Sequence, residues 1–112
     1  MPERHPALTP GPGSPDPPAV QLSIIVPTLN EAAGIGAALS ALAPLRARGH
    51  EVIVVDGGST DATVAAALPS ADRVLHAERG RARQMNAGAR VAGGDVLVFL
   101  HADTALPPAA DA

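Results

Sequence analysis

Two short apolar runs that end abruptly in small, polar and acidic residues constrain the fold of this chain most. The first, residues 22–26, leads into Pro27-Thr28-Leu29-Asn30-Glu31, and the second, residues 52–55, leads into Asp56-Gly57-Gly58-Ser59-Thr60-Asp61. Buried strands of parallel sheets have this β-branched composition, and an open α/β sheet binds its ligand at the carboxyl ends of its strands. We therefore expect both endings at one edge of a parallel sheet, where they would form the functional site.

Strand and helix patterns alternate along the rest of the chain. Strands are expected over residues 22–26, 51–55, 73–76 and 96–100, and helices from about residue 31, over 61–68 and over 80–91. Pro27 should end the first strand and Pro44 should kink or shorten the first helix, because proline lacks a backbone donor. Ser59 or Asp61 would cap the second helix. The alternation predicts an α/β fold with a mostly parallel sheet and flanking helices.

Composition sets the domain organisation and excludes several classes of protein. Residues 1–20 hold most of the twelve prolines and are expected to be a disordered leader, and residues 21–112 would form one partial domain. The net charge of −3 argues against nucleic-acid binding, and the lack of cysteine excludes disulfides and zinc-thiolate sites. No apolar run approaches the roughly 20 residues of a membrane span. A cytoplasmic protein is expected, with peripheral membrane attachment left open.

Asp56 and the pair His101 and Asp103 are candidate ligand-binding residues. Asp56 ends an apolar strand before two glycines, so its carboxylate could bind a base or ribose; alternatively it serves only the turn. His101 and Asp103 follow the last expected strand, and residues two apart in an extended segment point the same way. They could face Mg²⁺ or Mn²⁺, although an edge histidine and a helix cap would give the same pattern.

The helix expected over residues 80–91 is rich in arginine. Ala82, Met85 and Ala89 share the face that should pack on the sheet. Arg81 and Arg83 lie near the amino-terminal end, whose partial positive charge attracts anions, so a phosphate or sugar hydroxyl could dock there. The alternative is a solvated arginine face.

These residues, in this order, resemble family 2 glycosyltransferases, which have the nucleotide-binding, Rossmann-like GT-A fold. The exit of the first strand is similar to the family's P-x-x-N-E, and the exit of the second to its D-D-G-S-x-D. Gly80 with Asn86-Ala87-Gly88 is similar to its helix motif, and His101-Ala102-Asp103 lies where the family has a metal-binding D-x-D. GRARQMNAG at 80–88 and FLHADT at 99–104 resemble a bacterial subgroup of the family.

The resemblance implies the donor-binding half of an enzyme that moves a sugar from a nucleotide-diphosphate sugar, commonly a UDP-sugar, to an unknown acceptor. It implies a role for each matching position. Pro27, Asn30 and Glu31 would border the nucleotide pocket, Asp56 would bind the base, Arg81 and Arg83 would contact the donor, and Asp103 with His101 would hold a divalent cation, Mn²⁺ or Mg²⁺. That cation would neutralise the diphosphate as it leaves.

The chain departs from the family pattern in three residues and in length. Gly57 replaces the family's second aspartate, Met85 stands where many members have arginine, and His101 replaces the first aspartate of D-x-D. The family also needs a second half with an acceptor site and a catalytic base, which 112 residues do not provide. We expect a truncated sheet, a fragment that is inactive alone, and a longer protein that can associate with a membrane.

Two alternatives remain at this point. One is a Rossmann dinucleotide-binding module, because Gly34-Ile35-Gly36 precedes Asp56 at a suitable distance for a ribose carboxylate; Leu39 in the third glycine position argues against it. The other is a non-catalytic nucleotide-binding remnant that pairs with another chain.

Overall fold

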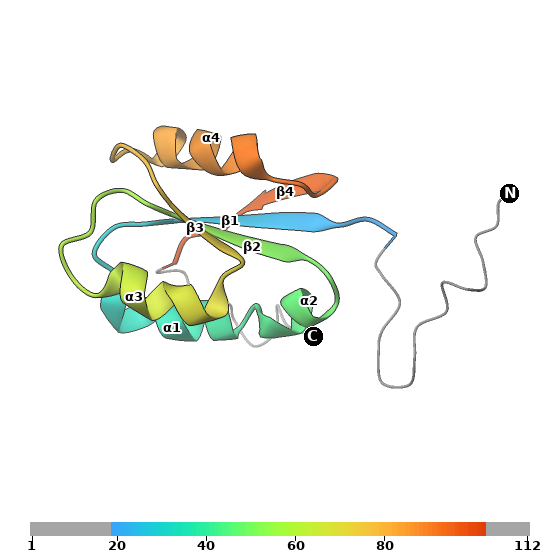
Figure 1. Ribbon diagram of the computed structural model, residues 1–112, viewed down its shortest axis with the longest axis horizontal. Helices are drawn as coiled ribbons and strands as arrows, with labels where there is room; N and C mark the ends of the chain where they lie inside the picture. Colours follow the sequence, from blue (N-terminus) through green and yellow to red (C-terminus); the bar gives the residue numbers. More distant parts are fainter. Residues whose placement is uncertain (1–18, 103–112) are drawn as a thin grey trace, which may run out of the picture.

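The computed structural model describes residues 19–102, which form a sheet between two layers of helices (Figure 1). Residues 1–18 of the expected leader, and Asp103, lie outside this range. In chain order the elements are β1 (Leu22–Thr28), α1 (Ala32–Ser40), α2 (Ala43–Ala47), β2 (Glu51–Asp56), α3 (Thr63–Ala67), a 3₁₀ turn (Leu68–Ser70), β3 (Arg73–His76), α4 (Arg81–Val91) and β4 (Val96–Phe99).

The four strands are arranged in the order β3-β2-β1-β4, and every neighbouring pair is parallel. Ile25 of β1 lies opposite Ile53 of β2 on one side and Phe99 of β4 on the other. The predicted α/β class and parallel sheet are thereby confirmed. The chain runs outward from β1 through β2 to β3 and then returns to place β4 on the other side of β1, so the strand order reverses between β1 and β4.

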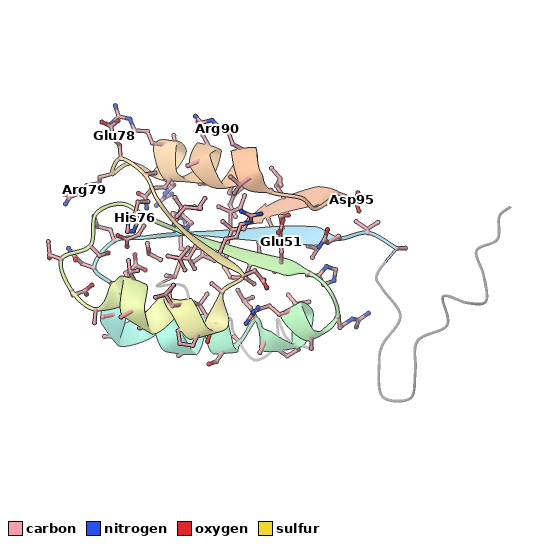
Figure 2. The ribbon with its side chains drawn as sticks, in the orientation of Figure 1. Glu51, His76, Glu78, Arg79, Arg90 and Asp95 are labelled. Carbon is pink, nitrogen blue, oxygen red and sulfur yellow. The ribbon has the colours of Figure 1, made fainter. Side chains whose placement is uncertain are left out.

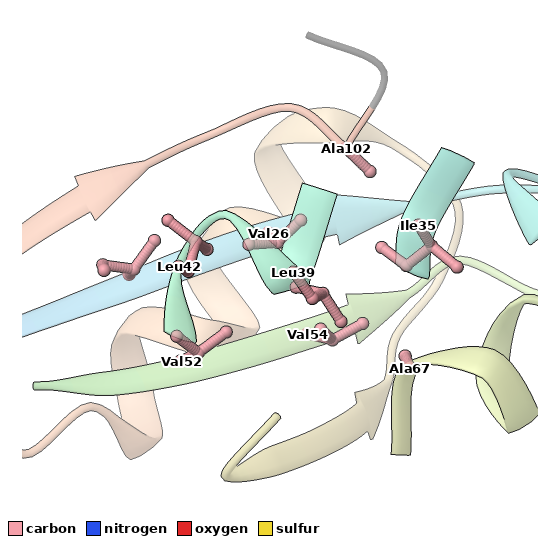
Figure 3. Packing of buried hydrophobic residues seen from close by; sticks show 9 residues of the cluster. Val26, Ile35, Leu39, Leu42, Val52, Val54, Ala67 and Ala102 are labelled. Atoms are coloured by element: carbon pink, nitrogen blue, oxygen red, sulfur yellow. The ribbon is translucent and has the colours of Figure 1, made fainter. Parts of the chain in front are cut away.

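Both faces of β1 and β2 are buried, which explains their nearly continuous apolar sequences. On one face, residues such as Val26, Val52 and Val54 pack with Ile35 and Leu39 of α1 (Figure 3). On the opposite face, Ile25, Ile53 and Val55 form a second cluster that is covered by α4. Alternate side chains along each strand thus supply the two halves of the core.

The face of α4 that packs on the sheet differs in part from the expected one, although Ala89 packs against the second cluster as expected. Gln84 and Gly88 are buried, whereas Ala82 is exposed and Met85 is only half-buried. A Cβ on Gly88 would lie 2.6 Å from Cγ2 of Ile25, so the helix approaches the sheet more closely than a side chain there would allow. The helix packs through its smallest residue, Gly88, because only glycine allows this close approach. A prediction based on which residues are apolar does not detect this.

Pro27 lies inside β1 and does not end it. Parallel strands direct their backbone groups alternately to the two sides; Ile25 O accepts from Leu100 N, and Thr28 O accepts from Gly57 N on the other side. Pro27 therefore faces the β4 side just beyond the last paired residue, where no backbone donor is needed. Pro44 does interrupt the first helical segment as expected, because α1 ends at Ser40 and Pro44 lies in the first turn of α2.

No helix within residues 19–102 has the length and apolar character required to cross a membrane.

Candidate functional site

A pocket of about 200 Å³ lies at the carboxyl end of β1, between the start of α4 and the residues that follow β4. Its lining residues are Pro27, Thr28, Leu29, Glu31, Arg79, Gly80, Arg81, Gln84 and His101. This is the place where the strand order reverses, and open α/β sheets bind ligands in the crevice at that point. Figure 2 shows Arg79, Glu78 and His76 at this end of the molecule and Asp95 at the other. The pocket brings together Pro27, Glu31, Arg81 and His101 of the expected site residues.

The loops that follow β1 and β2 are tied together beside this pocket. Asn30 N donates to Ser59 Oγ at 2.8 Å, and Asn30 Oδ1 accepts from Thr60 N at 2.7 Å. Asn30 has φ +52°, a left-handed conformation that asparagine tolerates better than most residues. Asn30 is exposed and does not line the pocket, so its observed role is to join the two loops.

The carboxylate of Asp56 is buried, and its own loop surrounds it. Oδ1 accepts from the hydroxyls of Thr28 at 2.9 Å and Ser59 at 2.5 Å, and Oδ2 accepts from the backbone N–H groups of Gly58 at 3.0 Å and Ser59 at 2.7 Å. Burial raises the pKa of this carboxyl, but the hydrogen bonds from Ser59, Thr28 and Gly58 outweigh it, so the pKa lies below its ordinary value. Both oxygens are thus engaged within the protein, and Asp56 does not line the pocket.

Ala62 occupies the N-cap position of α3 and makes no side-chain cap, so neither Ser59 nor Asp61 is the cap that was expected; Asp61 instead accepts hydrogen bonds from residues around it. Its Oδ1 accepts from the backbone N–H of Thr63 at 2.9 Å and from the Thr63 hydroxyl, and its Oδ2 accepts from Ala32 N at 3.2 Å. The hydrogen bond from the Thr63 hydroxyl is the main cause of a lowered pKa for Asp61. Glu31 N donates to Thr63 Oγ1 at 2.8 Å, and Glu31 Oε2 accepts from Leu29 N at 3.1 Å. Glu31 therefore reaches the pocket from a firmly held loop.

The arginines near α4 occupy different positions relative to the pocket. Arg79 and Arg81 line it, on either side of Gly80. Arg83 does not line it, and its Nη1 lies 3.3 Å from Glu78 Oε1 in an exposed ion pair. Arg81 and Arg79, together with the amino-terminal end of α4, therefore present positive charge to the pocket.

Gln84 is a lining residue that the sequence interpretation missed. Its Nε2 donates to Thr28 O and to Val55 O, both at 2.9 Å, and its Oε1 accepts from Gly80 N at 3.1 Å. A signal for it was present in the sequence: a glycine inside a helix is costly unless the helix must approach a neighbour closely. Gly88 thus marks the packed face, and Gln84 lies one turn earlier on that face.

Only part of the expected cation site can be placed. His101 lines the pocket, while Asp103 lies outside the described residues. Within residues 19–102 no group of three or more His, Asp or Glu side chains is arranged to hold a metal ion.

Comparison with known proteins identifies the family. A family model described as "Glycosyl transferase family 2" matches residues 23–111. The chain belongs to glycosyl transferase family 2. The match covers β1 to β4 and the pocket, so the fold and the candidate site both lie within the family domain.

Two curated relatives illustrate what the chain is similar to. The chain is similar to a PGL/p-HBAD biosynthesis glycosyltransferase of Mycobacterium tuberculosis, with 39% identity over 95 residues that cover 79% of this chain and 37% of that protein. It is also similar to a glucosyl-3-phosphoglycerate synthase of the same organism, with 31% identity over 96 residues that cover 77% and 30%. The chain thus spans about a third of the length of these relatives.

Solved structures agree with the family assignment. A crystal structure of the M. tuberculosis glucosyl-3-phosphoglycerate synthase with Mn²⁺, UDP and glucosyl-3-phosphoglycerate matches with a TM-score of 0.70 and 29% identity, covering 80% of this chain and 36% of that one. A second structure of that enzyme, with Mn²⁺, UDP-glucose and phosphoglyceric acid, matches with a TM-score of 0.69 and 28% identity, covering 80% and 35%. The sheet and helices therefore have the GT-A arrangement of glycosyltransferases.

The glycines of the dinucleotide-binding alternative are not placed for that role. Gly34 and Gly36 lie inside α1, outside the turn that follows β1, and neither lines the pocket. In dinucleotide-binding folds such glycines form the tight turn against the pyrophosphate. The structure does not support this alternative.

Proposed function

We propose that this chain forms the donor-binding part of a glycosyltransferase that moves a sugar from a nucleotide-diphosphate sugar to an acceptor. The supporting observation is the arginine-lined pocket at the strand-order reversal of a family 2 domain. A diphosphate needs positive charge and convergent donors, and Arg79, Arg81 and the start of α4 provide both. Relatives crystallised with UDP and UDP-glucose support the choice of a uridine nucleotide.

The expected site residues take distinct parts in this proposal. Pro27 and Glu31 border the nucleotide within the pocket, and Asn30 holds the loop beside it. Arg81 contacts the diphosphate, and Arg83 supports it from the rim by its charge. For Asp56, the four internal hydrogen bonds favour the alternative role in the turn over direct binding of the base.

The chemistry of the chain's own residues fits a divalent cation. His101 lines the pocket and Asp103 is two residues further along, so an imidazole and a carboxylate would be completed by the phosphate oxygens of the donor. Mg²⁺ and Mn²⁺ are commonly held by one or two protein carboxylates plus substrate phosphates. Such a cation would stabilise the negative charge of the departing nucleotide diphosphate.

Several finer expectations remain predictions. They are the division into residues 1–20 and 21–112, the bacterial subgroup with the GRARQMNxG and FLHADT motifs, and a membrane association of a longer protein. We also propose that sugar transfer needs an acceptor site and a catalytic base outside residues 19–102. The isolated chain should then bind donor without transferring sugar.

Calorimetric titration of UDP and UDP-glucose into the chain, first with Mn²⁺ and then with EDTA, tests the proposal. Binding should require the cation and should be lost in Asp103→Ala. Arg81→Ala should weaken binding roughly tenfold or more, because it removes a charge-assisted contact to phosphate. Arg90→Ala is the matched control, since Arg90 is exposed near the far end of α4 (Figure 2). Absence of UDP binding by folded wild-type chain would contradict the donor-binding proposal.

A further inference from the structure

Gln84 has a buried side-chain amide whose hydrogen bonds join three segments of the fold. The residue is 5% exposed. Both hydrogens of its Nε2 are used, one on Thr28 O at the end of β1 and one on Val55 O near the end of β2, and its Oε1 accepts from Gly80 N before α4. Removing this amide would take away the acceptor of Gly80 N, which is costly for a partly buried donor, and one of the two donors to Thr28 O, which also accepts from Gly57 N.

Two of the three joined segments are walls of the pocket. Thr28 and Gly80 both line it, and Arg79 and Arg81 flank Gly80 in the sequence. Gly80 has φ +140°, a conformation that side chains rarely allow, so the chain turns sharply there before α4 begins. The hydrogen bond from Gly80 N to Gln84 therefore holds the turn that carries the two pocket arginines.

Gly57 provides the space that this amide occupies. A Cβ on Gly57 would lie 2.8 Å from Oε1, 2.9 Å from Cδ and 3.1 Å from Nε2 of Gln84. The amide cannot simply move away, because all its polar atoms are anchored by hydrogen bonds. By contrast, a Cβ on Gly36 would meet nothing within 4 Å.

We propose that Gln84 is a positioning residue for the donor pocket, and that it acts with Gly57 as a coupled pair. Gln84 fixes the arginine-bearing turn against the ends of β1 and β2, and Gly57 must lack a side chain for the amide to stay there. The inference rests on the proposed function of the pocket and adds a determinant of donor affinity that does not touch the donor. A side chain at position 57 should therefore displace the Gln84 amide and so disturb the positions of the two pocket arginines.

The first test compares wild-type chain with Gln84→Met, which keeps a similar length and removes the amide. Amide hydrogen exchange measured by NMR should be about tenfold or more faster at Gly80, as expected for the loss of one hydrogen bond. The Kd for UDP with Mn²⁺ should rise about tenfold at a temperature where circular dichroism shows the variant fully folded. Arg90→Gln, on the same helix, should change neither quantity.

The second test is a double-mutant cycle between positions 57 and 84. Gly57→Ala should weaken UDP binding and speed exchange at Gly80 when Gln84 is present, whereas Gly36→Ala should do neither. In the Gln84→Ala background, Gly57→Ala should have little further effect on either quantity, because the amide it displaces is gone. If the Gln84 variants fail to fold, the proposal is tested by comparing Gly57→Ala with Gly36→Ala. Weaker UDP binding and faster exchange at Gly80 in Gly57→Ala alone would support it, and equal behaviour of the two variants would overturn it.

The outcomes separate this inference from the proposed function. Normal exchange at Gly80 in Gln84→Met, or additive effects of the two substitutions, would overturn the positioning role even if wild-type chain binds UDP. If wild-type chain binds no UDP while Gly80 is released and the cycle shows coupling, the positioning of the turn stands and the donor assignment fails.

Discussion

At the scale of single residues, Asp56 shows how a carboxylate can be buried in this fold. Desolvation of a charged group costs several kcal/mol unless hydrogen bonds replace the lost water. Two hydroxyls and two backbone N–H groups supply that replacement for Asp56, and they also shape the loop of Gly58 and Ser59. The residue therefore links the end of β2 to the geometry of the loop beside the pocket.

Asp56→Asn should lower the free energy of unfolding by about 1–3 kcal/mol. If the amide oxygen keeps the hydrogen bonds from Gly58 N and Ser59 N, the new NH₂ group meets the hydroxyls of Thr28 and Ser59, which would have to turn and accept. The negative charge that strengthens these hydrogen bonds is also lost. Urea denaturation measures the change. Glu78→Gln is the control, because the Glu78 carboxylate is 80% exposed and should contribute little. Equal stabilities of the two variants would show that the Asp56 hydrogen bonds do not stabilise the fold.

Acid should destabilise the chain through three carboxyls. The pKa values of Asp56, Asp61 and Asp72 all lie below the ordinary value of 3.8. For Asp72, burial raises the pKa, but hydrogen bonds from Arg46 and Val52 N lower it by more than burial raises it. Their stabilising contribution is complete above the unfolded-state value and is lost as the pH falls below it through the folded-state values. The Tm at pH of about 3 should thus be lower than at about 5. The drop should be smaller in Asp56→Asn, and an equal drop would exclude Asp56 as a contributor.

At the scale of secondary-structure elements, glycine serves opposite purposes in α1 and α4. A Cβ on Gly36 in α1 would meet nothing within 4 Å, so this glycine only adds flexibility to the unfolded chain. A Cβ on Gly88 in α4 would lie 2.6 Å from Ile25 Cγ2 and 3.1 Å from Val55 Cγ2. The absence of a side chain at Gly88 is what lets α4 lie close to the sheet.

Gly36→Ala should therefore stabilise the chain by about 0.5–1 kcal/mol, and Gly88→Ala should destabilise it by about 1–3 kcal/mol. Thermal unfolding followed by circular dichroism would measure both under the same conditions. The two variants are matched controls, since each replaces a helical glycine by alanine. A stabilising effect at Gly88 would mean that α4 can move outward at little cost.

The sequence was sufficient for elements defined by local patterns. The expected β3 agrees with the structure in both bounds, and β2 and α4 agree within one residue at each end. The expectations that failed depended on tertiary packing. Pro27 is tolerated in β1 because β4 has ended beside it, and Ala82 is exposed because close approach at Gly88 sets the orientation of α4. Neither fact is visible in a local window of sequence.

The candidate site could also be predicted only in part, because local patterns place some of its residues and tertiary packing places the others. Pro27, Glu31 and His101 lie at the pocket because the carboxyl ends of parallel strands meet at one edge, and Arg81 lies there because it begins α4. Gln84 was missed because its hydrogen-bond partners lie 56 residues away at Thr28 and 29 residues away at Val55. Only the folded chain brings these backbone carbonyls to one side chain.

At the scale of the whole molecule, β4 is the least protected part of the sheet. It pairs with β1 on one side and, among the strands of residues 19–102, has no neighbour on the other (Figure 1). Its four apolar residues are all exposed, from Val98 at 36% to Val96 and Phe99 at 46%. An apolar edge strand of this kind is a template for pairing with another chain.

The chain should consequently self-associate with rising concentration, and Leu97→Lys should reduce this association. Sedimentation velocity over a range of concentrations gives the measurement. Leu68→Lys is the control, because Leu68 is an exposed apolar residue in the 3₁₀ turn, away from the β4 edge. An equal reduction by both substitutions would assign the association to general surface hydrophobicity.

The strand order also sets a sequence of events during folding. Contacts between β1 and β2 join residues 28 positions apart in the sequence, such as Thr28 and Asp56. Contacts beside β1 and β4 join residues 74 positions apart, such as Gln21 and Asp95. Shorter separations close faster, and on the ribosome β1, β2 and β3 are synthesised before α4 and β4. We expect β1 to spend an interval paired on one side only. The pocket, whose walls include Arg81 and His101, would then be completed in the final folding step.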